Sequence, residues 1–122
     1  MDIKNIGYNI GVIDIDTELT SGTPAELGTL DDLKKIYNIA KNSGIARINA
    51  TIGETSMSGA CFLNPFTDAN GIGVDVGSVT NFGGSPSLIS GTFYVNSGKM
   101  YGVVTLTAVS APTKTAAKTA SK

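Results

Sequence analysis

The sequence predicts one α+β domain: a mainly antiparallel β-sheet or sandwich with one amphipathic helix packed on it, an extended N-terminal arm and a polar C-terminal tail. Residues 29–44 alone combine helical periodicity with helix end signals. From residue 45 onward, apolar and polar residues alternate between glycine-rich turns, as in strands. The length of 122 residues and the 41% apolar content fit a single domain. We therefore expect an arm or strand and loop (1–28), a helix plus antiparallel β domain (29–110) and a low-complexity tail (111–122).

The first 28 residues divide into two parts. The stretch IKNIGYNIGVIDI has apolar residues in mixed periods of two and three, interrupted by Gly7 and Gly11, so we expect an extended arm or strand. The stretch that follows, DTELTSGTPAELG, places Gly22, Pro24 and Gly28 among polar residues. This composition predicts a loop leading to the helix.

The helix has clear signals at both ends. Thr29 can cap its N-terminus with Asp32 three residues later, and Gly44 supplies the left-handed residue that ends many helices. Between them, apolar residues recur on one face while lysines and asparagines occupy the other. The apolar stripe consists of Leu30, Leu33, Ile36, Tyr37 and Ala40. We expect this face to pack on the sheet, with no catalytic role.

The rest of the domain reads as strands. IARINATI (45–52) alternates strictly, which predicts a strand with one buried face. The following segments are expected to be a strand (57–63), a turn-rich loop (64–71), a strand (72–79), a link (81–87) and a hairpin formed by 88–95 and 99–109.

The hairpin is the best-specified strand pair. Asn96, Ser97 and Gly98 form a three-residue connection, with glycine where positive φ is needed, and Tyr94 and Tyr101 flank it as a cross-strand pair. Antiparallel pairing of these strands is therefore expected. The predicted core consists of Leu33, Ile36, Tyr37, Ile48, Val74, Val104 and Leu106.

Charge is distributed unevenly although the net charge is only −1. Residues 1–32 contain seven acids and one lysine, a local charge of −6, whereas 111–122 contain three lysines and no acid, giving +3. Such ends suit subunits that dock end to end. This distribution does not suggest a nucleic-acid partner, which usually needs a basic face on the folded body.

No apolar run approaches the ~18 residues of a membrane helix, so no membrane insertion is expected. The N-terminus carries acids where a secretory signal carries bases. We expect synthesis in the cytoplasm without secretory export.

The chain has no histidine and no tryptophan, and Cys61 is its single cysteine. Without histidine, Ser-His-Asp and Cys-His catalysis and histidine metal sites are excluded. Cys61 is therefore expected to be a small buried side chain. No enzymatic activity, cofactor or catalytic residue is predicted.

Carboxylates offer two candidate sites, and neither has a convincing pattern. Asp14, Asp16 and Glu18 form a D-x-D-x-E run, but the glycine and bidentate glutamate of a calcium loop are not at the required offsets. An acid pair for catalysis would have to come from residues that no spacing brings together, Glu54, Asp68 and Asp75. No metal site is predicted.

Three features together resemble the minor structural proteins of tailed-phage virions, the head-fibre, decoration and tail-accessory group. They are the helix LDDLKKIYNIAKNSG leading into IARINATIG, the terminal GTFYVNSGKMYGVVTLTAV, and the Thr/Ala/Lys tail. The resemblance lies in style and order of elements and includes no diagnostic motif. It implies a virion subunit that forms homo-oligomers, with trimers favoured, and attaches to a major capsid or tail protein through a terminal segment.

Two other functions stay open at this level. A carbohydrate- or cell-surface-binding module would form its site from 64–71 and 81–87. A small enzyme using only carboxylates would need an acid pair in a cleft. The sequence favours the virion structural protein, because the usual catalytic groups are missing.

Overall fold

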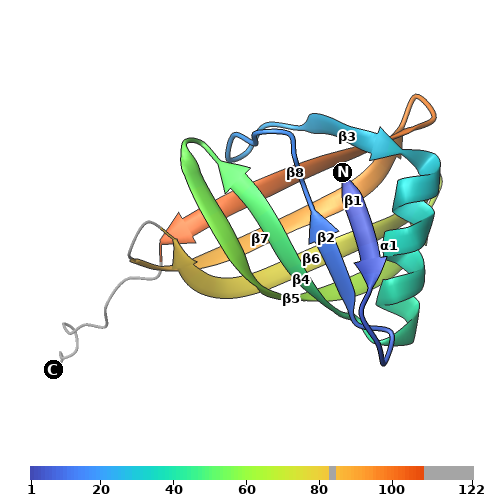
Figure 1. The fold of residues 1–122 in the computed structure, drawn as a ribbon. Helices are drawn as coiled ribbons and strands as arrows, with labels where there is room; N and C mark the ends of the chain where they lie inside the picture. Colours follow the sequence, from blue (N-terminus) through green and yellow to red (C-terminus); the bar gives the residue numbers. More distant parts are fainter. Residues whose placement is uncertain (83–84, 109–122) are drawn as a thin grey trace, which may run out of the picture.

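The computed structural model describes residues 1–82 and 85–108 as one curled sheet with a helix (Figure 1). Its elements are β1 (Asp2–Asn5), β2 (Gly11–Asp14), β3 (Ala25–Thr29), α1 (Leu30–Asn42), β4 (Ile45–Ile52), β5 (Thr55–Asp68), β6 (Gly71–Phe82), β7 (Ser85–Asn96) and β8 (Lys99–Ala108). The α+β fold is confirmed. The sheet is single, so the sandwich alternative is not what the described residues form.

The eight strands follow the order β1-β2-β4-β5-β6-β7-β8-β3. Neighbouring strands pair antiparallel except β2 and β4, which are parallel. A parallel pair needs a long crossover connection, which residues 15–44 supply through β3 and α1. The predicted antiparallel pairing of 88–95 with 99–109 is confirmed for the part that the structure describes, in β7 and β8.

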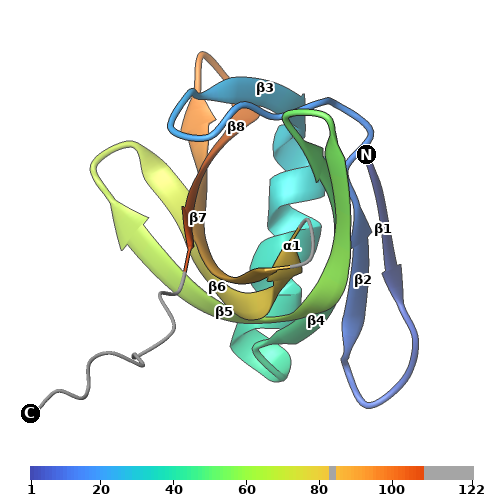
Figure 2. The same cartoon turned by 90° about the vertical axis from the view of Figure 1, so that its left-hand side faces the viewer.

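The sheet curls until its two sides meet through residues 15–22 (Figure 2). On one side, the amide of Leu19 donates to the carbonyl of Thr51 in β4 at 2.8 Å. On the other, the amide of Gly22 donates to the carbonyl of Val104 in β8 at 2.6 Å. This segment therefore joins β4 to β8, and we call it the closing segment.

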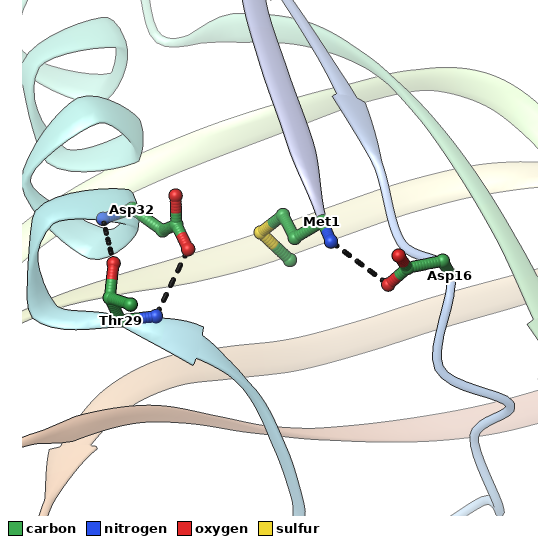
Figure 3. Close-up of polar contacts among 4 residues, drawn as sticks. All are labelled: Met1, Asp16, Thr29 and Asp32. Carbon is green, nitrogen blue, oxygen red and sulfur yellow. Dashed lines mark hydrogen bonds and ion pairs between the residues drawn. The ribbon is translucent and has the colours of Figure 1, made fainter.

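The helix α1 lies across one end of the curled sheet and contacts every strand (Figure 1). Its predicted start is confirmed: Asp32 donates its amide to the Thr29 hydroxyl at 3.1 Å, and the Asp32 carboxylate accepts from the Thr29 amide at 3.0 Å (Figure 3). This capping box satisfies two amides that a helix start leaves unpaired. At the other end, Gly44 has φ +71° and donates to Ile39 at 2.9 Å, as predicted.

The core fills the interior of the sheet and the space under α1. Leu33, Ile36 and Val74 are fully buried, and Ile48 is 6% exposed, as predicted. The other predicted core residues are only partly buried at its margin: Tyr37, Val104 and Leu106. The alternation of the sequence shows which side chains of a strand point inward. It does not show how deeply each of them is buried, because burial depends on where α1 covers the end of the sheet.

The N-terminal segment is not a separate arm. Residues 2–14 form the β1–β2 hairpin, in which Ile13 is completely buried, and residues 25–29 form β3 within the region predicted as a loop. β1, β2 and β3 belong to the same sheet as the later strands. Each of these strands pairs with residues distant in the sequence, which local patterns do not report.

Two predicted loops are mostly strand. Residues 64–68 continue β5, and Pro65 is tolerated there because β4 ends at the Ile45–Phe62 pair and leaves that edge of β5 unpaired. Of the predicted link 81–87, residues 81–82 in β6 pair with 85–86 in β7, Ser87 pairs with Thr80, and 83–84 lie outside the described residues. The tail 111–122 and Val109 also lie outside them.

The turn between β7 and β8 is one residue shorter than predicted. Asn96 pairs with Lys99, so the connection consists of Ser97 and Gly98, with φ of 55° and 75°. Two successive positive φ angles are those of a type I′ turn, which matches the twist of a hairpin. The predicted Tyr94–Tyr101 pair is confirmed, with ring centroids 6.1 Å apart.

Candidate functional site

Among the described residues, the cavity inside the curled sheet is too small for a ligand larger than water. The cavity there has a volume of about 20 Å³ and is lined mostly by apolar side chains such as Leu19, Ile52 and Phe93. That is room for about one water molecule. Ser78, one of the polar residues in this lining, donates its hydroxyl to the carbonyl of Ala60 at 2.7 Å. We therefore look for the candidate site on the outer surface.

The D-x-D-x-E run does not converge on one point. Asp14 accepts a hydrogen bond from the Asn49 side chain, and Asp16 lies 2.9 Å from the amino group of Met1 (Figure 3). Within the described part of the chain, no three residues among His, Cys, Asp and Glu are grouped so that they could hold a metal ion. The two aspartates are bound to different partners within the fold.

The Met1–Asp16 contact changes the acidity of both groups. The hydrogen bond from the amino group lowers the pKa of the Asp16 carboxyl, and the same bond raises the pKa of the amino group above 8.0. Each charge favours the ionised form of the other. Because the Asp16 side chain is 77% exposed, water screens the ion pair. The ion pair holds the start of β1 in place.

The three carboxylates considered for catalysis lie apart. Glu54 is in the turn before β5, and Asp68 ends that 14-residue strand, so β5 separates them. Asp75 is in the middle of β6, where it accepts a hydrogen bond from the Thr92 hydroxyl at 2.9 Å. Asp68 accepts from the Asn70 amide at 2.8 Å within its own turn. The geometry does not bring these groups together in one cleft.

Cys61 is buried, as the sequence predicts, with 1% of its surface exposed. Burial raises the pKa of its thiol to about 11, because the charged thiolate loses its hydration. The thiolate is the reactive form of cysteine. This environment makes Cys61 a packing residue.

We predict that Cys61 resists thiol reagents in the folded protein. At pH 8, a pKa of about 11 leaves roughly one thiol in a thousand ionised, and burial blocks access to it. Labelling with a chromogenic disulfide reagent should be far slower in buffer than in guanidinium chloride, where the same cysteine serves as its own control. Equally rapid labelling in both solutions would contradict this burial.

The two segments proposed for a glycan site lie at opposite ends of β6. Residues 64–71 lead into the start of β6, whereas 81–82 end β6 and 85–87 begin β7. Because β6 is 12 residues long, the described parts of these two segments cannot form one binding site. A site on this part of the sheet must instead use the outward side chains of the strands.

Outward side chains form a candidate site on the outer surface of β4 to β7. Four large apolar residues, one from each strand, are exposed there: Ile45 (39%), Phe62 (67%), Val79 (72%) and Leu88 (42%). Ile45 pairs with Phe62, and Val79 pairs with Leu88. We call these four residues the outer apolar face. The other large apolar residues exposed in the described chain, Ile6 and Tyr8, lie at the tip of the β1–β2 hairpin.

A shallow hollow of about 360 Å³ adjoins Phe62 on this face. Its floor includes Gly77, which pairs with Phe62 and has no atom within 4 Å of the position a Cβ would take. Ala60, Val79 and Leu88 form its apolar walls, and the Asn64 amide lies at its margin. The hollow can accept an apolar group about the size of a side chain.

Sequence reasoning missed this face. The signal is present in the run ACFL (60–63), where the side chains on both faces of the strand are apolar, although only Cys61 and Leu63 are buried. A strand with one buried face needs apolar residues on that face only, so an apolar residue that points outward requires a separate explanation. The face itself becomes visible only when the register of four strands is known.

In the described part of the chain, the single helix is too short and too polar to cross a membrane. Comparison with protein-family models, with curated proteins and with solved structures finds no match to this chain.

Proposed function

We propose that this protein is a non-enzymatic structural subunit that assembles with further copies of itself and with a larger shell. The outer apolar face carries this proposal. It gathers four exposed apolar side chains on adjacent strands, and a contiguous apolar patch in water marks an interaction surface. The filled interior and the separated carboxylates fit a protein that acts through its surface.

The setting proposed for this subunit is a tailed-phage virion. The order of helix, sheet and polar tail resembles head-fibre, decoration and tail-accessory proteins, which implies a major capsid or tail protein as the second partner. The resemblance favours a trimer. Localisation in the virion, after synthesis in the host cytoplasm, is part of the same proposal.

Of the two terminal segments that could attach the subunit, residues 1–16 are less suited than residues 111–122. An apolar arm would seek a foreign surface, but its large apolar residues are largely used within the fold, where Ile13 and Ile15 are 0% and 7% exposed. Only the hairpin tip with Ile6 and Tyr8 is left for outside contacts. The terminal contribution to assembly therefore rests on the lysines of residues 111–122.

We predict that removing residues 111–122 weakens assembly in a salt-dependent manner. The segment contributes +3, and exposed carboxylates such as Glu18 and Asp31 are in no ion pair among the described residues. Charge attraction between copies is screened over ~8–10 Å at moderate ionic strength. Light scattering should give a mass that is a multiple of 12.5 kDa for the full chain, and a weaker assembly for residues 1–110 at low salt.

Raising the salt concentration provides the control, because the two chains should then assemble similarly, and their melting temperatures should agree throughout. Equal assembly at every salt concentration would remove the tail from the proposal. A full chain that stays at 12.5 kDa at all concentrations would count against self-assembly itself.

A carbohydrate-binding module is the second candidate, favoured by one observation. The exposed Phe62 ring lies beside the Asn64 amide, and stacking plus hydrogen bonding is how many sites hold a ring-shaped ligand. Micromolar binding of the isolated protein on a glycan array, lost in Phe62→Ala, would support this function. Absence of any such binding would leave the assembly role as the proposal.

A further inference from the structure

The outer apolar face has one cation and one anion beside it, on opposite sides. Arg47, the only arginine of the chain, lies on β4 and pairs with Ala60 of β5. Asp75 lies on β6 and pairs with Asn64 of β5. Both side chains are exposed on the same outer surface as Phe62, which is midway between Ala60 and Asn64 along β5. The two charges therefore occupy opposite corners around the Phe62 ring.

Within one copy, these charges cannot meet. They are two strands and four residues apart, which corresponds to roughly 15 Å at ordinary strand spacing and rise. Neither takes part in an ion pair within residues 1–82 and 85–108. Their polar contacts are local: Arg47 donates to the Ser58 hydroxyl at 2.9 Å, and Asp75 accepts from Thr92. Both contacts are with neutral hydroxyl groups, so Arg47 and Asp75 can each form an ion pair with a partner molecule.

We infer that the outer apolar face pairs with the same face of a second copy across a two-fold axis. The axis lies in the plane of the face and runs from Phe62 diagonally toward Val79. A rotation of 180° about this axis places Arg47 of one copy over Asp75 of the other. By symmetry, Asp75 of the first copy lies over Arg47 of the second, so two ion pairs form. The inference rests on the proposed function as a self-assembling subunit, names the surface that it uses, and replaces the trimer that the resemblance favours with a dimer.

Shape agrees with this arrangement. Phe62 and Val79 are the two most exposed side chains of the face and lie on the axis, so each packs against its own counterpart and its neighbour. The hollow over Gly77 lies directly beside the axis, where it can receive apolar atoms from the second copy. A self-complementary face with apolar residues at its centre and opposite charges at its rim is the usual anatomy of a symmetric interface.

A second copy fits this face better than a sugar does. A sugar site needs several polar groups that converge on the aromatic ring, whereas the hollow beside Phe62 is walled mainly by Ala60, Val79 and Leu88. The nearest carboxylate, on Asp75, already accepts a hydrogen bond from Thr92. Arg47 and Asp75 lie on opposite sides of Phe62 and do not converge on one point, whereas the two-fold dimer pairs both charges.

The test is a charge exchange in the full chain, measured by analytical ultracentrifugation at low salt. Arg47→Asp and Asp75→Arg, made singly, each place two like-charge contacts in the dimer and should raise its dissociation constant about tenfold or more. The double variant restores both pairs with reversed polarity and should return to within about threefold of the parent. Phe62→Ala should raise the dissociation constant at least about tenfold.

Two variants serve as matched controls. Tyr101→Ala removes an aromatic side chain from β8, where it pairs with Tyr94, six residues along β7 from Leu88. Exchanging Glu26 and Lys99 reverses an exposed ion pair between β3 and β8, away from this face. Both should leave the dissociation constant unchanged, and melting temperatures of all variants should show that each is folded.

The outcomes separate this inference from the proposed function. Dimerisation that weakens in both single charge variants and recovers in the double variant supports the two-fold face. A trimer, or any oligomer insensitive to Phe62→Ala and to the charge exchange, overturns the two-fold face and leaves self-assembly in place. A monomer at all concentrations overturns both. Sugar binding abolished by Phe62→Ala, without dimerisation, assigns the face to a glycan and overturns the inference.

Discussion

Replacing Ile36 by alanine should destabilise the domain by about 2–5 kcal/mol. Ile36 is completely buried on the inner face of α1, together with the fully buried Leu33, Val74 and Met100 of the same core. Because α1 closes one end of the curled sheet and contacts every strand, atoms removed there leave a cavity that no flexible loop can fill. The melting temperature should fall on the order of 10 °C.

The matched control for this substitution is Lys35→Ala. Lys35 is the preceding residue of the same helix, but its side chain is exposed, so its loss should change the free energy of unfolding by less than about 0.5 kcal/mol. Chemical and thermal unfolding measure both variants. If Ile36→Ala were no more destabilising than Lys35→Ala, α1 would have to be peripheral to the fold.

Gly91→Ala is expected to be the second strongly destabilising substitution, at about 1–3 kcal/mol. A Cβ at this position would lie 2.5 Å from the carbonyl oxygen of Val103 and 3.0 Å from a methyl group of Val104. Gly91 pairs with Val104 in the β7–β8 ladder, so the obstacle is backbone of a paired strand and cannot rotate away. The strands would have to separate locally, with loss of hydrogen-bond geometry.

Gly77→Ala is the control for Gly91→Ala. Gly77 lies on the neighbouring strand β6, and its added Cβ would meet no atom within 4 Å. Its effect on the free energy of unfolding should stay within about 1 kcal/mol, measured at a dilution where chains do not associate. Equal destabilisation by the two alanines would show that lost glycine flexibility, and not the contact with Val103, determines the result.

Local signals in the sequence account for what was predicted correctly. The helix has its capping box at Thr29 and Asp32 and its left-handed Gly44, all within one short segment. The strict alternation of residues 45–52 likewise identifies β4 and its buried side. The β7–β8 hairpin is found because its turn residues are adjacent in the chain.

The errors arise where strand structure depends on distant partners. Residues 25–29 form β3 only through pairing with β8, and their glycine and neighbouring proline look like a loop. Residues 64–68 extend β5 because β6 pairs with them, in spite of Pro65. The charged corners of the outer apolar face could not be predicted either, since the positions of Arg47 and Asp75 relative to Phe62 follow from the register of three strands.

The closing segment has a consequence for how the chain reaches its fold during synthesis. Translation delivers β3 early, but its partner β8 begins only at Lys99, so the pairing waits for nearly all of the described chain. Until then, the hydrogen bond from Gly22 to Val104 cannot form, and the apolar interior stays open at that side. Contacts of such long sequence separation slow folding. A nascent chain on the ribosome therefore carries unburied apolar strands until β8 emerges, and such exposed apolar surface favours aggregation.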